Sequence, residues 1–403
     1  MKQTTTGWWH IELADLKEHL KQIAVDSGAV LFGVGSKERL KDAPPSGEMN
    51  YLLPGAESCI IWAYATPINT LENYLSKKER ASYKNNMHFA YSTSWKSAVD
   101  IAAFIEKNSG FKAVPVPPNI GYRVGVLQFK TRLLVGRWLL RHGLAKKMVA
   151  KVIARTFGEK SIPGFSLRYG AVAAGIGRIG WSGNLISEEH GSAIYLAGAL
   201  TTAPMEPDPL AENNHCNKCK CCVKACPTGF FSMDEEETPV TIAGRQEIYA
   251  KRNSFARCYC GCGGLSGLGP GGKWSTWTPD HECLKEISEE SMTDARFREK
   301  LLYKLLFAKD TPESQRNFNK DILIAYMNGG ILGNAGLRPL EDTHPTCGVC
   351  QAVCVADPGE RKRLLGLLHT SGKMFVDEQG NEYIERPDGS IYYPPAELET
   401  EKS

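Results

Sequence analysis

Cysteine residues carry the clearest chemical signal in this sequence. Four of them, followed at once by a proline, form a C-x2-C-x2-C-x3-C-P motif: Cys216, Cys219, Cys222, Cys226 and Pro227. Two intervening residues let successive thiolates converge on one iron–sulfur cluster, while the fourth thiolate points away and ligates a second cluster. The proline lacks an amide hydrogen and should end the helical turn. A structural zinc site is the alternative, but such sites usually pair two C-x2-C hooks.

A second motif near the other end of the chain supplies further thiolates. Its spacing is C-x2-C-x3-C: Cys347, Cys350 and Cys354. In two-cluster ferredoxins each motif gives its last cysteine to the other motif's cluster. Applied here, that rule predicts two [4Fe–4S] ligand sets: Cys216, Cys219, Cys222 and Cys354, and Cys226, Cys347, Cys350 and one further cysteine.

The further ligand must come from the cysteines between the two motifs: Cys258, Cys260, Cys262 and Cys283. Cys258 ranks first and Cys262 second, because both lie on the glycine-rich turn nearest to the first motif. Cys221 falls outside the register of that motif and is interpreted as a bystander. Cys59 lies in an apolar run, so we expect a small buried side chain.

The composition is that of a globular protein in a reducing compartment. The 403 residues are 42% hydrophobic and 23% charged, enough for one large domain or two to three ordinary ones. A net charge of +3 gives no strong nucleic-acid signal. All of the 13 cysteines except Cys59 lie after residue 215, which points to metal ligation and not to a disulfide scaffold. No secretory leader or membrane-spanning run is recognised, so a cytoplasmic location is expected.

The pattern before the first motif alternates between helix and strand, which argues for an α/β layer sandwich. Apolar periodicity predicts helices over 12–27 and 92–108, and apolar runs predict strands over 29–34, 58–65, 111–116 and 192–201. Residues 130–155 alternate basic and apolar side chains. A packed helix pair with a solvated basic face is the favoured interpretation, and a peripheral contact with an anionic membrane is the alternative.

Glycines form a run before the last of these strands. Gly175, Gly177 and Gly180 match G-x-G-x-x-G, but they follow a helix, whereas a dinucleotide fingerprint follows a strand. Glycine also permits close backbone approach to a large planar ligand.

These residues and motifs together resemble cobalamin-dependent reductases, namely reductive dehalogenases and epoxyqueuosine reductases. The resemblance rests on five stretches: Leu52–Ala56, Ala174–Gly180 with Gly183-Asn-Leu, His190-Gly, Leu200-Thr-Thr-Ala-Pro before the first motif, and Thr346–Cys354. It covers roughly residues 12–120 and 165–356. Val355 replaces the usual proline after the last cysteine, and neither a helical-repeat domain nor a twin-arginine leader is recognised.

The resemblance implies an α+β fold, with a nitroreductase-like cobalamin-binding core and a C-terminal two-cluster bacterial-ferredoxin-like domain. The expected division is a core over 1–210 with a basic helical insertion at 130–160, a ferredoxin-like domain over 211–370 and a polar tail with hairpin turns over 371–403. It implies base-off cobalamin near five residues: Gly175, Gly177, Gly180, Gly183 and Asn184. The candidates for a catalytic proton donor are Tyr122, Tyr169 and Tyr195.

The resemblance also ranks the activities. Reductive dehalogenation of a small organohalide comes first, with electrons from an external low-potential donor such as a ferredoxin or flavodoxin. Reduction of an epoxide on a modified tRNA base is the alternative. An iron–sulfur electron-transfer protein without cobalamin is the third hypothesis.

Overall fold

The centre of the molecule is a four-stranded sheet. The computed structural model describes residues 11–118, 147, 151, 163–262, 277, 284–307, 347–379 and 381–395. The sheet has the order β1-β2-β6-β3, and each neighbouring pair is antiparallel. Its strands are β1 (Leu31–Ser36), β2 (Ser58–Ala65), β3 (Ala113–Val116) and β6 (Ile194–Thr201). The fold is therefore α+β; the α/β sandwich expected from helix–strand alternation is wrong, because that architecture needs parallel strands.

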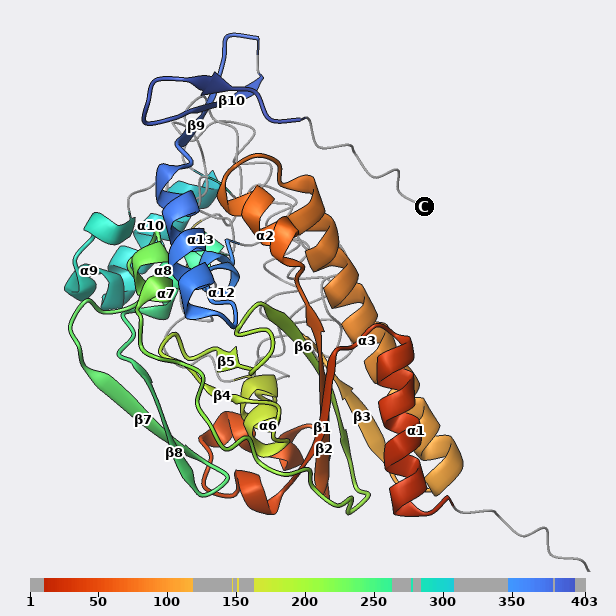
Figure 1. Ribbon diagram of the computed structural model, residues 1–403. Helices are drawn as coiled ribbons and strands as arrows, with labels where there is room; N and C mark the ends of the chain where they lie inside the picture. The colour runs from red at the N-terminus through yellow and green to blue at the C-terminus, as the bar shows by residue number, and fades with distance from the viewer. Residues whose placement is uncertain are drawn as a thin grey trace, which may run out of the picture.

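Helices cover both faces of this sheet (Figure 1). Helices α1 (Leu13–Asp26) and α3 (Ala81–Ser109) pack on one face, and α6 (Leu167–Ala173) packs on the other. Successive β2 residues alternate between the two cores, with Ile61 toward α6 and Trp62 toward α3. Because both faces are covered, β2 reads as an unbroken apolar run. Cys59 is buried among these residues, as predicted.

The predicted ranges for this part agree with the observed elements. The predicted strand over 58–65 is confirmed, and the helix over 12–27 corresponds to α1, which buries Leu16, Leu20 and Ala24. Gly28 follows this helix with a φ of 93°, a left-handed conformation that glycine adopts without strain. The helix predicted over 92–108 begins earlier, at Ala81, because its first three turns carry polar residues that hide the apolar period.

Short elements follow the first cysteine motif. They are α7 (Cys221–Ala225), β7 (Glu237–Ile242), β8 (Arg245–Ala250), α8 (Phe255–Cys262), α9 (Glu289–Thr293), α10 (Ala295–Phe307), α12 (Val349–Ala352) and α13 (Pro358–Thr370). The β7–β8 hairpin was not predicted. It turns at Ala243 and Gly244, both with positive φ, and alanine is not a residue that signals such a turn.

The C-terminal segment folds as a small antiparallel sheet, at the top of Figure 1. Its strands are β9 (Lys373–Val376), β10 (Glu382–Glu385) and β11 (Ile391–Tyr392), which confirms the predicted hairpin turns. Arg80, just before α3, pairs with Glu382 at 2.6 Å. Lys77 follows the short helix α2 (Ile68–Leu75), and its Nζ donates to Ser371 Oγ at 2.5 Å and to the Gly372 carbonyl at 2.8 Å. The loop between α2 and α3 therefore anchors this sheet.

Lys77 gives the fold a testable pH dependence. It is 6% exposed, and burial lowers the pKa of its ammonium to about 8. The pKa of Lys77 is lower in the folded protein than in the unfolded chain, so folding favours the neutral amine. The contribution of Lys77 to the free energy of unfolding is therefore complete above about pH 10.4 and is lost as the pH falls through 8. We expect the wild type to gain about 3 kcal/mol over Lys77→Met between pH 8 and 10.5. Thermal midpoints across this range measure it; a Lys77→Met profile parallel to the wild type would contradict the expectation. Lys78→Met, at the exposed neighbouring position, is the matched control.

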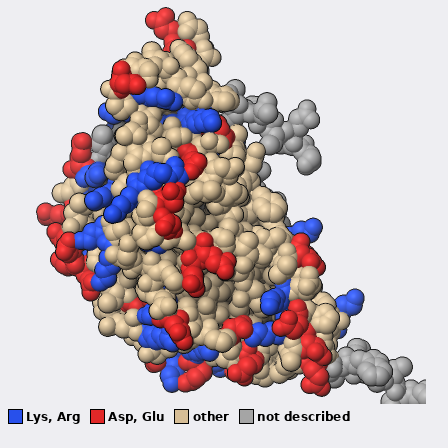
Figure 2. Space-filling model, in the orientation of Figure 1, with Lys and Arg blue, Asp and Glu red and all other residues tan. Residues whose placement is uncertain are grey.

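Charges are distributed over the surface without one dominant sign. On the face drawn in Figure 2, basic and acidic side chains are interspersed over most of the elements. Within the described ranges no helix is both long and apolar enough to cross a membrane. The basic block 130–155 lies outside the described residues except for Lys147 and Lys151, so its predicted membrane contact stays a prediction.

Candidate metal centre

The two cysteine motifs meet in the structure although they lie far apart in the sequence. Helix α7 carries Cys222 and helix α12 carries Cys350, and the two helices pack against each other (Figure 1). Burial raises the pKa of the Cys222 thiol, and four neighbouring cysteines raise it further: Cys354, Cys350, Cys216 and Cys219. The cysteines of the first predicted ligand set therefore lie near Cys222 together with Cys350 of the second set, and their division between two clusters stays a prediction. Ionised thiols crowded in this way repel one another unless iron or another cation binds them, so the donor set fits an iron–sulfur cluster.

The two motifs also share a local backbone conformation. Lys220 precedes α7 with a φ of 59°, and Gly348 precedes α12 with a φ of 56°. In each motif this left-handed residue follows the first cysteine of a C-x2-C pair and starts a short helix. Cys226 leaves that helix in an extended conformation before Pro227, as the missing proline amide predicted. A positive φ costs a lysine more conformational free energy than it costs a glycine. The packing around Lys220 must therefore stabilise this conformation.

Hydrogen-bond donors surround the sulfurs of the first set. The backbone amide of Trp181, which ends the glycine run, donates to Cys216 Sγ at 3.2 Å. The Ser192 hydroxyl bonds to the Cys354 thiol and lowers its pKa, against the larger raising effect of burial. Such bonds stabilise negative charge on ligating sulfur and tune the potential of a cluster.

Arg361 on α13 joins the ends of the two motifs. It is 1% exposed and has no carboxylate within ion-pair distance among the described residues. Its guanidinium donates to the carbonyls of Val355 at 2.6 Å and Ala356 at 2.8 Å, beside Cys354. It also reaches the His215 carbonyl at 3.1 Å and Asn217 Oδ1 at 3.3 Å, on either side of Cys216. The burial of Arg361 was not predicted from the sequence, because one arginine in an amphipathic helix gives no sign that it is buried.

The second predicted ligand set is partly gathered. Cys226, Cys258 and Cys350 belong to one buried cluster, while Cys347 packs in the neighbouring one with Cys221. Tyr74 on α2 holds the carbonyl of Cys347 through its hydroxyl at 3.0 Å. Cys260 and Cys262 lie within α8, but their side chains are outside the described residues, as is Cys283. Within the described residues no group of three or more His, Cys, Asp or Glu is arranged to hold a single metal ion.

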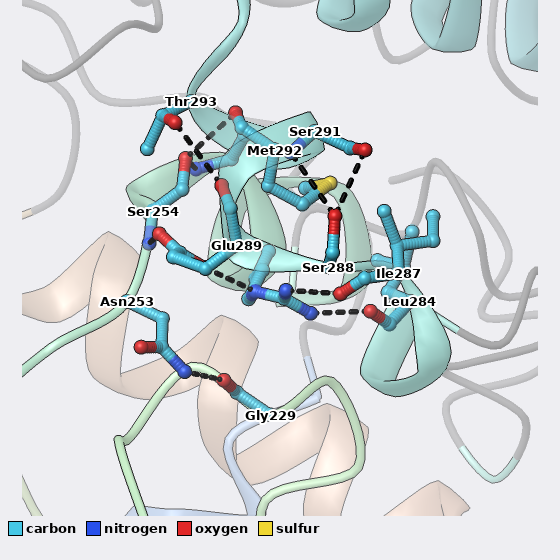
Figure 3. A network of polar contacts seen from close by, with 12 residues as sticks. Gly229, Asn253, Ser254, Leu284, Ile287, Ser288, Glu289, Ser291, Met292 and Thr293 are labelled. Atoms are coloured by element: carbon cyan, nitrogen blue, oxygen red, sulfur yellow. Dashed lines mark hydrogen bonds and ion pairs between the residues drawn. The ribbon is translucent and has the colours of Figure 1, made fainter.

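A buried arginine also fixes the segment of Cys258. The preceding residue, Arg257, is 3% exposed and pairs with Glu289 at 2.9 Å (Figure 3). It donates to the Ile287 carbonyl at 2.5 Å and to the carbonyl of Leu284. Asn253 adds a bond to the Gly229 carbonyl at 2.8 Å. The start of α8 is thereby tied to α9 and to the loop after the first motif.

The three tyrosine candidates have different surroundings. Tyr122 lies outside the described residues. Tyr195, on β6, is 7% exposed in the core beneath α3, where its ring meets that of Tyr91 at 5.2 Å and it bonds to Tyr83. Tyr169, on α6, is only partly buried on the opposite face of the sheet. Burial raises the pKa of Tyr169 despite the opposing charges of Arg168 and Arg252, so the phenol keeps its proton at neutral pH.

The glycine candidates pack against the chain itself. A Cβ on Gly175 would lie 1.9 Å from the Pro209 carbonyl oxygen, and one on Gly177 would lie 2.3 Å from that of Ile186. One on Gly180 would meet the Ile186 side chain at 2.4 Å. Internal packing thus accounts for glycine at these positions, and their role in cofactor binding stays a prediction.

The remaining candidates, Gly183 and Asn184, accept hydrogen bonds from a neighbouring arginine. Arg168 on α6 donates to the carbonyl of Gly183 at 2.8 Å and to Asn184 Oδ1 at 3.4 Å. Arg252, after β8, donates to the Ser182 carbonyl at 3.2 Å and lies over the ring of Tyr249 at 4.5 Å. Tyr169 and Cys258 both lie within electrostatic range of Arg252. The turn at Ser182–Asn184 therefore lies near a phenol, two guanidinium groups and a cysteine proposed for the second cluster.

Comparisons with known proteins point to one group by sequence. No family model matches the chain. Epoxyqueuosine reductase of Synechococcus sp. (strain RCC307) is 28% identical over 234 residues, which cover 54% of this chain and 62% of that protein. Shorter matches reach proteins of the same name in other bacteria. The match thus spans less than two thirds of the length of the Synechococcus protein. The chain is similar in sequence to epoxyqueuosine reductases.

Solved structures of two kinds are similar to the chain. The catabolic reductive dehalogenase NpRdhA has a TM-score of 0.42 at 14% identity, covering 77% of this chain and 37% of the dehalogenase. An epoxyqueuosine reductase solved with a tRNA-Tyr epoxyqueuosine-modified stem loop has a TM-score of 0.35 at 14% identity, covering 89% of this chain and 82% of that protein.

Proposed function

We propose that this protein is an iron–sulfur reductase with an epoxyqueuosine reductase-like activity, and that its cofactors are two [4Fe–4S] clusters and a corrinoid. The observation that carries the proposal is the gathering of buried and partly buried cysteines from two distant motifs around Cys222. The similarity in sequence to epoxyqueuosine reductases supports the substrate class. Reductive dehalogenation was the first-ranked activity in the sequence analysis. It is now the second candidate, because the relatives found by sequence are named epoxyqueuosine reductases.

The protein residues have separable roles in this proposal. Four thiolates would hold the cluster of the first set: Cys216, Cys219, Cys222 and Cys354. Thiolate-ligated clusters supply electrons at low potential, and a reduced corrinoid supplies a nucleophilic metal. The Trp181 amide and the Ser192 hydroxyl stabilise charge on the ligating sulfurs. Tyr169 holds a proton near Arg168 and Arg252, the two arginines that contact the Gly183 and Ser182 carbonyls, and a phenol held there can act as a general acid.

The cofactors are tested by their content. Anaerobically reconstituted protein should contain about eight irons and eight sulfides per chain, because two cubane clusters are proposed. It should also retain about one corrinoid. Iron analysis that saturates at four or fewer contradicts the two-cluster assignment. Full iron content without corrinoid would instead identify an iron–sulfur electron-transfer protein.

The substrate class is tested by turnover with a ferredoxin or flavodoxin as the external electron donor. Conversion of an epoxyqueuosine-containing tRNA stem loop, with a gel shift for the same RNA, is the expected result. Dehalogenation of organohalides without conversion of the RNA would reverse the order of the two activities.

A further inference from the structure

Arg252 lies at the turn of Ser182 and Gly183 and has no carboxylate at ion-pair distance among the described residues. Its Nε atom is buried and has no hydrogen-bond acceptor among the described residues. A guanidinium has five N–H donors, and the Ser182 carbonyl accepts from one of them, at 3.2 Å. The rings of Tyr249 at 4.5 Å and Phe230 at 5.7 Å flank its plane. Cation–π contacts offset part of the cost of burying this charge, but they satisfy none of the in-plane donors.

A second guanidinium shares the same turn. Arg168 is exposed and donates to the Gly183 carbonyl at 2.8 Å, one residue after the carbonyl that Arg252 contacts. Neither arginine has a carboxylate at ion-pair distance within the described part of the chain. Because the two guanidinium charges repel each other, each raises the free-energy cost of keeping the other charged at this turn. A bound anion would offset that repulsion.

Gly183 makes this arrangement sterically available. Its φ is 72°, and a Cβ built there would lie 1.7 Å from a terminal nitrogen of Arg252. Any other residue would push the guanidinium out of its present position. The turn between β4 (Arg178–Ile179) and β5 (Leu185–Ile186) is therefore shaped around Arg252.

We propose that Arg168 and Arg252 form a binding site for a phosphate group at the turn of Ser182 and Gly183. Two positive charges without a carboxylate match a dianion better than a monoanion, and the planar forks of two arginines suit phosphate oxygens. Arg168 is exposed to solvent, whereas the Nε of Arg252 is buried. This inference does not rest on the proposed reductase activity.

The test is a titration of the reconstituted protein with inorganic phosphate by calorimetry, with ionic strength held constant by chloride. The wild type should show saturable binding at one site. Arg252→Gln and Arg168→Gln should each weaken it about tenfold or more, because each removes charge-assisted hydrogen bonds. Lys251→Gln, an exposed position whose side chain pairs with Glu236, removes the same charge next to the site and should change affinity less than about twofold.

The outcomes separate clearly. Absent or non-saturable phosphate binding overturns the proposal, as does binding that survives both arginine substitutions. Acetate that binds as tightly as phosphate overturns the assignment to phosphate. If Arg252→Gln lowers the thermal midpoint too far for titration, Arg168→Gln decides, because Arg168 lies on the surface and makes two local bonds.

Discussion

Cys354→Ala should remove the cluster of the first motif, although Cys354 belongs to the second. In the structure the pKa of its thiol is raised first by burial and also by the proximity of Cys216 and Cys219, and its assignment to the first ligand set is a prediction. A cubane that loses one of four thiolates has an open iron and is expected to degrade. Iron should fall from about eight to about four per chain, and turnover with a physiological donor should drop by more than about a hundredfold.

Anaerobic EPR of the reduced protein measures this loss directly. Cys221→Ala is the near control, since Cys221 is buried on α7 beside Cys219 but outside the motif register. Cys59→Ala, in the core beneath α6, is the distant control. Both variants should keep two cluster signals. A Cys221→Ala variant that loses a cluster while Cys354→Ala keeps both would show that the ligand assignment is wrong.

Spacing and periodicity were sufficient for much of the fold. The strand over 58–65 was predictable because both its faces are buried, which leaves an uninterrupted apolar run. The proximity of Cys354 to Cys216 was predictable because ferredoxin-type ligation brings the last cysteine of one motif to the other motif, while the ligand exchange itself stays a prediction. The antiparallel order β1-β2-β6-β3 was not, since strand direction depends on connections that the pattern of single elements does not encode.

The pairing of two arginines at one turn was not predicted, for a different reason. Arg168 and Arg252 lie far apart in the sequence, and each reads as an ordinary surface arginine. Only folding places both on the turn at Ser182 and Gly183. The glycine run was noticed, but its purpose in the structure is internal. Gly175 and Gly177 approach other backbone segments, and Gly183 leaves room for Arg252.

Arg361→Met should damage the same centre without removing a ligand. The substitution keeps an unbranched side chain but removes the donor of three carbonyls, those of Val355, Ala356 and His215, while Asn217 Oδ1 keeps its bond from the Cys219 amide. Each buried acceptor left unsatisfied costs about 1–3 kcal/mol, so we expect a loss of about 3 kcal/mol or more in the free energy of unfolding. The segments before Cys216 and after Cys354 would no longer be joined, and the first cluster should be lost faster on exposure to a chelator.

Arg363→Met on the same helix is the matched control. Arg363 is exposed and pairs with Glu360 at 2.7 Å and with Glu72, so its removal should cost no more than about 1 kcal/mol. Chemical unfolding and the rate of iron release to a chelator, measured for both variants, separate the two positions. Equal stability and equal iron release in Arg361→Met and Arg363→Met would mean that the two motifs hold together without the buried guanidinium. In that case the packing of α7 against α12 would be sufficient to place Cys354 beside Cys216.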